Sequence, residues 1–191
     1  MPGLTGRDPK EVFETFRDHL GRLLNRTITD APLSLIHARN EDRAQVAFRR
    51  GQASIAAPVF TNDLFLYIGQ VLRVAQQRDG SWKLRTVQYR YRIQGSAGLE
   101  DEDCLRWEYV SREVRDTAHC RHHLHLQGEY TLGPRRTIPL AKVHIPTGWV
   151  TVEEIIRFLI TELDVRPKEQ GWEKLLRESE EAFKQWTARD I

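Results

Sequence analysis

Apolar side chains recur at helical spacing near both ends of the chain and alternate with polar side chains in between. Near the N-terminus they form one stripe, made of Val12, Phe13, Phe16, Leu20, Leu23 and Leu24, which is typical of an amphipathic helix. The preceding Asp8-Pro9-Lys10-Glu11 supplies a cap, a proline suited to the first helical position and a box-like glutamate. The pattern therefore predicts a helix from about residue 9 to about residue 25.

Two more helices are predicted after residue 150. Thr151-Val152-Glu153-Glu154 is a capping box, and it precedes an apolar stripe that Pro167 ends. A last stripe predicts a helix from about residue 168 to about residue 188; it consists of Trp172, Leu175, Leu176, Phe183 and Trp186. This stripe is wide for one short helix, so it either covers a sheet or forms an exposed interface. We expect the second use, a homodimer through the C-terminal helix.

Alternation between these ends predicts strands and turns. The candidate strands span residues 33–38, 45–49, 63–77, 82–94, 105–112, 120–129 and, more weakly, 138–145, and Asp79-Gly80 marks a hairpin turn. Helix, strands and two helices in that order are typical of an α+β fold. We predict one domain over residues 1–191, with the first helix in 1–30, the sheet in 31–145 and the helical pair in 151–188. The antiparallel sheet should have about five to seven strands, with the helices packed on one face.

Composition restricts the setting of this domain. The chain has 191 residues, and 40% of them are hydrophobic, so a substantial core can form. Its two cysteines make no disulfide framework, and it shows neither a secretory signal nor an apolar run long enough for a membrane span. We therefore expect a cytoplasmic protein with no membrane partner. The net charge of +2 conceals an asymmetry, because residues 39–95 carry ten Lys or Arg against four Asp or Glu. That segment is the expected surface for a polyanion such as RNA.

Histidines cluster in the candidate strand at residues 120–129. Four of the chain's seven histidines lie within residues 119–125, and alternation places Arg121, His123 and His125 on one strand face. Two imidazoles spaced like His123 and His125 can bind one metal ion, with Glu108, Cys120 or His144 as a third ligand. The chain has no Cys-x-x-Cys or His-Glu-x-x-His motif, so we expect no cofactor and no metal. If a metal is present, His123 and His125 are its expected ligands.

Neighbouring strands add polar side chains to the same predicted face. Alternation assigns to it Arg90, Arg92, Arg106, Glu108, Arg121, His123 and His125. Metal-free cleavage of a phosphodiester needs a base, an acid and cations that stabilise charge on phosphorus. The expected catalytic residues are His123, His125, Glu108 and Arg106, and the expected substrate-binding residues are Arg90, Arg92 and Arg121. The alternative is a solvated sheet face with cross-strand ion pairs.

Three short motifs in this order resemble the TumE-type family of bacterial toxins from toxin–antitoxin pairs. They are Tyr89-Arg90-Tyr91-Arg92-Ile93-Gln94, Arg106-Trp107-Glu108 and His122-His123-Leu124-His125, within about residues 60–130. The resemblance implies a ribonuclease activity and a cognate antitoxin, with Arg106, Glu108, His123 and His125 at the family's polar positions. Our first hypothesis is therefore a metal-independent ribonuclease that acts as a toxin. The alternatives are a non-catalytic module that binds nucleic acid or protein, and a metal-dependent hydrolase that uses the histidine cluster.

Overall fold

A large antiparallel sheet occupies the middle of the chain. The computed structural model describes residues 8–38, 42–60, 63–100, 104–111 and 120–187. The strands lie in the spatial order β1 (Leu33–His37), β2 (Arg43–Arg50), β5 (Phe65–Gln76), β6 (Trp82–Gln94), β7 (Cys104–Val110), β8 (His122–His125) and β11 (Ile145–Pro146). Short β3 (Ala53–Ser54) pairs with β2, and short β4 (Ala57–Pro58) pairs with β5. The predicted antiparallel sheet is thus confirmed; within the described residues it has nine strands, because β3 and β4 add to the seven on the main path.

The hairpin of β5 and β6 forms the centre of this sheet. The turn between these strands contains Gly80, whose φ of +81° explains why the Asp-Gly pair marks it. The register between the strands shifts at Val71/Leu72, where a β-bulge interrupts the ladder. Beyond the bulge, the register runs without a break from Gln70↔Tyr89 to Phe65↔Gln94, which fixes the side of the sheet that each residue of β6 faces.

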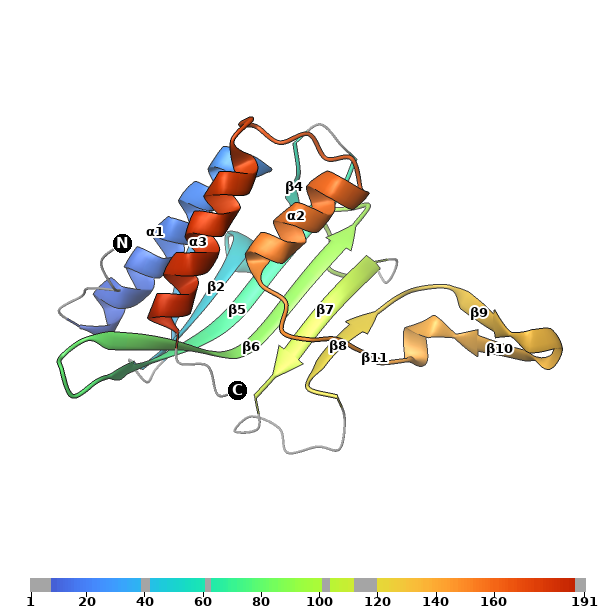
Figure 1. Cartoon of the computed structure of the whole chain (residues 1–191), viewed down its shortest axis with the longest axis horizontal. Helices are drawn as coiled ribbons and strands as arrows, with labels where there is room; N and C mark the ends of the chain where they lie inside the picture. The colour runs from blue at the N-terminus through green and yellow to red at the C-terminus, as the bar shows by residue number, and fades with distance from the viewer. Residues whose placement is uncertain (1–7, 39–41, 61–62, 101–103, 112–119, 188–191) are drawn as a thin grey trace.

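Three helices pack on one face of the sheet within the described chain, as Figure 1 shows. They are α1 (Pro9–Thr27), α2 (Val152–Glu162) and α3 (Trp172–Trp186). Asp8 caps α1 by accepting a hydrogen bond from the Glu11 amide, and the capping box at Thr151 and Glu154 is present at α2. The predicted α+β class, with one helix before the sheet and two after it, is confirmed.

The apolar stripe of α3 lies inside the protein. Leu176, Phe183 and Trp186 are buried in the main core together with residues of α1, α2 and the sheet, and Phe183 packs against Phe16 with ring centroids 6.0 Å apart. The stripe therefore covers the sheet and forms no exposed apolar patch. The homodimer was predicted because an exposed apolar face on this helix was expected, and the helix has no such face. The homodimer stays a prediction.

The strand predicted over residues 120–129 is divided into two. β8 ends at His125, and Gly128, with a φ of +97°, lies between it and β9 (Glu129–Leu132). β9 pairs with β10 (Arg136–Pro139) in a separate two-stranded hairpin that extends away from the main sheet in Figure 1. The helical turns η1 (Gly133–Arg135) and η2 (Leu140–Lys142) flank β10. Alternation alone did not reveal this break, because the residues on both sides of Gly128 also alternate.

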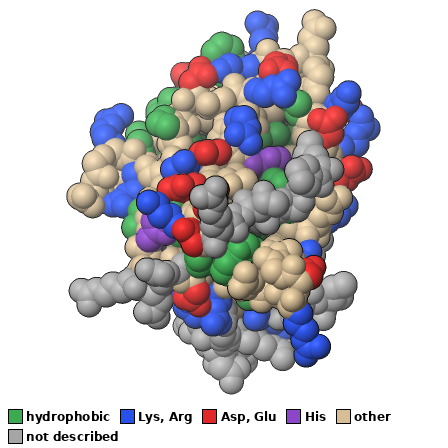
Figure 2. Space-filling model, turned by 90° about the vertical axis from the view of Figure 1, so that its left-hand side faces the viewer, with side chains coloured by type: hydrophobic (Ala, Val, Ile, Leu, Met, Phe, Trp, Pro, Cys, Tyr) green, Lys and Arg blue, Asp and Glu red, His purple; other side chains and the backbone are tan. Residues whose placement is uncertain are grey.

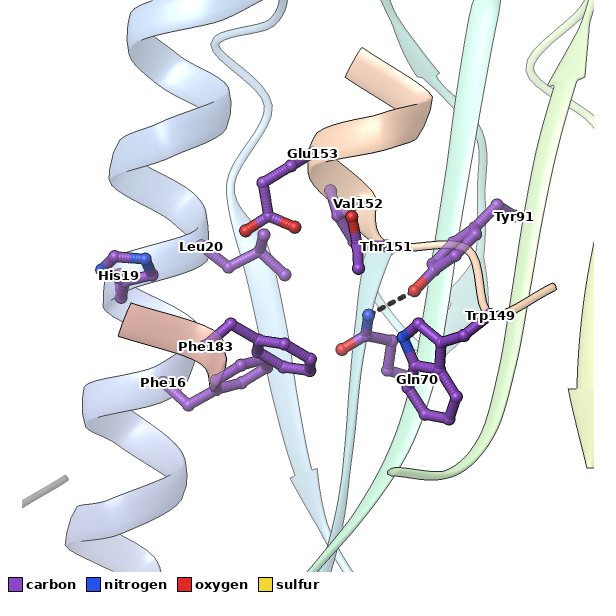
Figure 3. Close-up of a pocket in the computed structure, with 10 residues that line it drawn as sticks. All are labelled: Phe16, His19, Leu20, Gln70, Tyr91, Trp149, Thr151, Val152, Glu153 and Phe183. Carbon is purple, nitrogen blue, oxygen red and sulfur yellow. Dashed lines mark hydrogen bonds between the residues drawn. The ribbon is translucent and has the colours of Figure 1, made fainter. Parts of the chain in front are cut away.

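A cluster of polar side chains lies between the helices and the sheet. Ser179 donates a hydrogen bond of 2.5 Å to the carboxylate of Glu153, and His19 lies 2.9 Å from the same hydroxyl. Figure 3 shows Glu153 pointing from α2 toward α1, and Gln70 donating to the Tyr91 hydroxyl nearby. Burial raises the pKa of Glu153, so this cluster couples helix packing to protonation.

The visible surface is of mixed charge. On the side seen in Figure 2, basic and acidic side chains are interspersed, with only small apolar patches between them. Among the described helices, none combines the length and the apolar character that a membrane crossing requires.

Candidate functional site

The register of β6, β7 and β8 aligns the predicted polar residues in two rows across the sheet. In the first row Arg90 pairs with Glu108, and Glu108 pairs with His123. In the second row Arg92 pairs with Arg106, and Arg106 pairs with His125. Residues that are directly opposite in neighbouring antiparallel strands point to the same face. The structure thus brings together the four residues expected to be catalytic.

Glu108 is the centre of this polar cluster. Its Oε1 accepts a hydrogen bond of 2.5 Å from Nε of Arg90 and lies 3.7 Å from Nε of Arg106. Its Oε2 lies 3.4 Å from Nε2 of His123 and 3.3 Å from Nε2 of His125. Burial acts to raise the pKa of Glu108, but Arg90 and Arg106 outweigh it and lower that pKa. The carboxylate is therefore ionised at neutral pH.

A third histidine completes the cluster. His144 precedes β11, whose Ile145 pairs with Leu124 of β8, the residue between His123 and His125. One ring nitrogen each of His123, His125 and His144 lies within 4.8 Å of the others. The three rings have centroids 4.6–4.8 Å apart and are nearly perpendicular to one another, with interplanar angles of 76–80°. His144, which is far from His123 and His125 in the sequence, thus lies beside them in the fold.

The ring of His123 is held by its second nitrogen. Nδ1 lies 2.8 Å from the carbonyl oxygen of Cys120, which can only accept a hydrogen bond. In the neutral ring Nδ1 therefore carries the proton, and Nε2 directs a lone pair toward Glu108. The side chain of His123 is only 12% exposed, so this orientation is also fixed by packing.

His125 is the most enclosed of the three histidines. Its side chain is 11% exposed, and neither ring nitrogen has a hydrogen-bond partner among the described residues. Burial and the neighbouring Arg106 lower the pKa of His125 to about 4, although Glu108 opposes this effect. The imidazole is therefore neutral near pH 7, with a lone pair on one ring nitrogen and a proton on the other.

The expected substrate-binding arginines differ in position. Arg90 is half exposed beside Glu108, and Arg121 is exposed just before β8. Arg92 shares the face but is 6% exposed and donates a hydrogen bond to the carbonyl of Leu99. The geometry therefore supports Arg90 and Arg121 as contacts for an anion, whereas it supports a structural role for Arg92.

The remaining histidines and the cysteine occupy other environments. His122 points to the opposite face, where its ring stacks on Tyr109 with centroids 4.4 Å apart. Cys120 is half-buried, and its thiol donates to the carbonyl of His122. His119 lies outside the described residues. The strand alternation that separated His122 from His123 and His125 is thus present in the structure.

Sequence reasoning offered His144 only as one of three candidate third ligands. No spacing within the chain connects it to His123, because the β9–β10 hairpin separates the two residues. The pairing of β11 with β8 brings His144 to the cluster. A short strand containing Pro146 is a weak signal, so this pairing could not be inferred from alternation.

Comparison with known proteins adds no assignment: no family model, no curated protein and no solved structure matches this chain. The resemblance to TumE-type toxins therefore stays a prediction that depends on the three short motifs.

Proposed function

We propose that this protein cleaves phosphodiester bonds in RNA at the sheet face formed by β6, β7 and β8. The observation that carries the proposal is the contact of one half-buried carboxylate, Glu108, with two arginines and two imidazoles. This combination offers the proton-transfer groups and the fixed cations that phosphodiester cleavage needs. The three motifs that resemble TumE-type toxins contribute these same residues.

The charge around Glu108 favours an anionic substrate. Arg90 and Arg106 bring two positive charges to a single carboxylate, so the cluster retains a net positive charge when the histidines are neutral. The exposed Arg121 adds to this charge at the start of β8. A phosphate group beside Arg90 and Arg106 would neutralise the excess charge, and the arginines would stabilise the additional charge that develops on phosphorus.

The imidazoles can serve this reaction in two ways. As free groups, His123 and His125 would transfer protons to and from the reacting oxygens. As ligands, they would hold a metal ion that supplies the positive charge. These two roles give different responses to a chelator, because only the second needs a bound ion. A role as a toxin, a cognate antitoxin and a cytoplasmic location are parts of the proposal that rest on the sequence alone.

The direct test is cleavage of a labelled RNA oligonucleotide by purified protein, compared with Arg90→Ala and Arg106→Ala. We expect each variant to lose roughly a hundredfold in rate, because each removes one cation that stabilises the transition state. Arg26→Ala is a matched control, since Arg26 is also half exposed and also pairs with a glutamate, Glu169, but far from this face. Its rate should equal that of the wild type.

Three results would contradict the proposal. One is no cleavage by the wild-type protein under any tested metal and buffer condition. Another is equal loss of activity in Arg26→Ala and Arg90→Ala, which would indicate a general effect on folding. The third is tight RNA binding without cleavage, which would favour the alternative of a non-catalytic binding module.

A further inference from the structure

We infer that Glu108, His123, His125 and His144 bind one divalent first-row transition-metal ion. The role of this ion in RNA cleavage rests on the proposed function, whereas the binding of the ion does not. The four side chains come from β7, β8 and the segment before β11, so they belong to one sheet edge. Imidazole nitrogen with one carboxylate oxygen is a donor set that suits zinc, iron, cobalt and nickel.

The distances to Glu108 match those between ligands of one ion. A tetrahedral ion bound at about 2.0–2.1 Å places its ligand atoms about 3.3–3.4 Å apart. Oε2 of Glu108 lies 3.4 Å from Nε2 of His123 and 3.3 Å from Nε2 of His125. The third imidazole has a ring nitrogen within 4.8 Å of those of the other two, so a small rotation of the exposed His144 ring would complete the site.

The proton positions also favour an ion. Nδ1 of His123 faces the carbonyl of Cys120, so in the neutral ring a lone pair on Nε2 faces the carboxylate of Glu108. Two acceptors at this distance repel each other unless a proton or a metal ion lies between them. His125 brings a further ring nitrogen that has no hydrogen-bond partner among the described residues. One ion would satisfy all of these acceptors together.

Neighbouring groups hold the proposed ligands in place. Arg90 binds Oε1 of Glu108, which leaves Oε2 for the ion. The carbonyl of Cys120 sets the orientation of the His123 ring. Such outer partners are usual for metal-binding histidines and carboxylates, since they fix the ligand atom and its direction. If His123 and His125 bind the ion, their lone pairs are used for ligation, and they do not act as the acid and base of a metal-free reaction.

The test is a titration of chelator-treated protein with cobalt(II) chloride alone, followed by visible absorption. Cobalt(II) in a nitrogen-rich site of low coordination number gives characteristic absorption bands, which report ligation directly. We expect saturation at one equivalent for the wild type. His144→Ala and Glu108→Gln should each weaken cobalt affinity by about tenfold or more. Because His144 is exposed, its substitution should leave the fold intact, as circular dichroism would verify.

His37→Ala is the matched control, since His37 is another exposed histidine at a strand end, on β1. It should bind cobalt as the wild type does. The inference is overturned if the wild type shows no cobalt bands, or if His144→Ala and Glu108→Gln keep the wild-type affinity.

The titration contains no RNA, so the two proposals can fail separately. Cobalt binding without RNA cleavage would refute the proposed function and leave the metal site standing. Full RNA cleavage in excess chelator, by protein that gives no cobalt bands, would refute the metal site and support metal-free catalysis.

Discussion

The carboxyl group of Glu153 allows a quantitative prediction about stability and pH. Glu153 is 5% exposed, at the start of α2. It accepts a hydrogen bond from Ser179 on α3, and His19 on α1 lies beside the same hydroxyl. Burial raises the pKa of Glu153; hydrogen bonds from Ser179, its own backbone amide and Thr151 oppose the rise, and the charge of Glu180 adds to it. Glu153→Gln keeps the shape and the acceptor oxygen but removes the titration.

The sign follows from proton binding. Between the ordinary pKa of a glutamate and the raised pKa of Glu153, the folded protein binds more protons than the unfolded chain. The free energy of unfolding of the wild type therefore falls as pH rises through this range, by at most about 1.4 kcal/mol per pH unit from this one group. The stabilisation is fully present below the ordinary pKa and is lost above the raised one. Glu153→Gln has no such contribution, so it should become more stable relative to the wild type as pH increases.

Chemical denaturation of both proteins from pH 4 to pH 8 measures this difference. Comparing the two proteins at each pH cancels the titration of His122 and His125, whose pKa values burial lowers. Burial also lowers the pKa of His19, and His19→Gln in both backgrounds separates its contribution. Glu162→Gln is the control, because Glu162 is an exposed glutamate at the other end of α2. A stability difference between Glu153→Gln and the wild type that is independent of pH would refute the reasoning.

Further expected outcomes concern the metal site, the surface charge, a helix cap and the core. Zinc at a concentration of about a hundred times its dissociation constant should add about 2.7 kcal/mol to the free energy of unfolding of the wild type. Calorimetry should show this as a rise of roughly 5–11 °C in melting temperature, and a much smaller rise for His144→Ala. RNA affinity, measured by fluorescence anisotropy, should fall as the salt concentration rises. Arg90→Ala should make the slope of log affinity against log salt concentration shallower by about one, the amount expected for one lost phosphate contact. Equal slopes for the two proteins would argue against that contact. Thr151→Ala should cost about 1 kcal/mol in urea denaturation, because it removes the capping box of α2. Phe183→Ala should cost about 3–5 kcal/mol, whereas Leu132→Ala, at an exposed position, should change stability by less than about 0.5 kcal/mol.

Period-two alternation was a sufficient guide to the main sheet, and helical stripes with caps were sufficient for the helices. β6 spans Trp82–Gln94, the same residues as its prediction, because the Asp79-Gly80 turn precedes it and Gly95 follows it. β3, β4, β9 and the end of β8 were missed, and the strand predicted over residues 138–145 is divided among the end of β10, the turn η2 and the start of β11. Strands of two residues have no period to detect, and they exist because a neighbouring strand offers hydrogen bonds.

The part of the candidate site that could be predicted lies on β6, β7 and β8, because these strands are neighbours both in the sequence and in the sheet. Alternation placed Arg90, Arg106, Glu108, His123 and His125 on one face, and the register of β6, β7 and β8 has them opposite one another. Alternation predicts the face of a residue but not its burial. Arg92 was therefore expected at an open surface, whereas its guanidinium donates a hydrogen bond to the carbonyl of Leu99. The position of His144 depends on the return of the chain after the β9–β10 hairpin, which is a long-range contact.

The two faces of this sheet explain why such a site can be held with precision. The polar residues of β6 and β7 alternate with Tyr89, Tyr91, Trp107 and Tyr109, which are 1–8% exposed on the helix-covered face. Tyr89 and Tyr91 stack with ring centroids 4.6 Å apart, and Trp107 packs edge-on against Phe158 of α2. Each strand is thus fixed by aromatic packing directly behind the residues that surround Glu108. Rigid strands in a fixed register hold their side chains close to the geometry that the site needs. A metal centre and a phosphodiester-cleaving site both require such precise positioning.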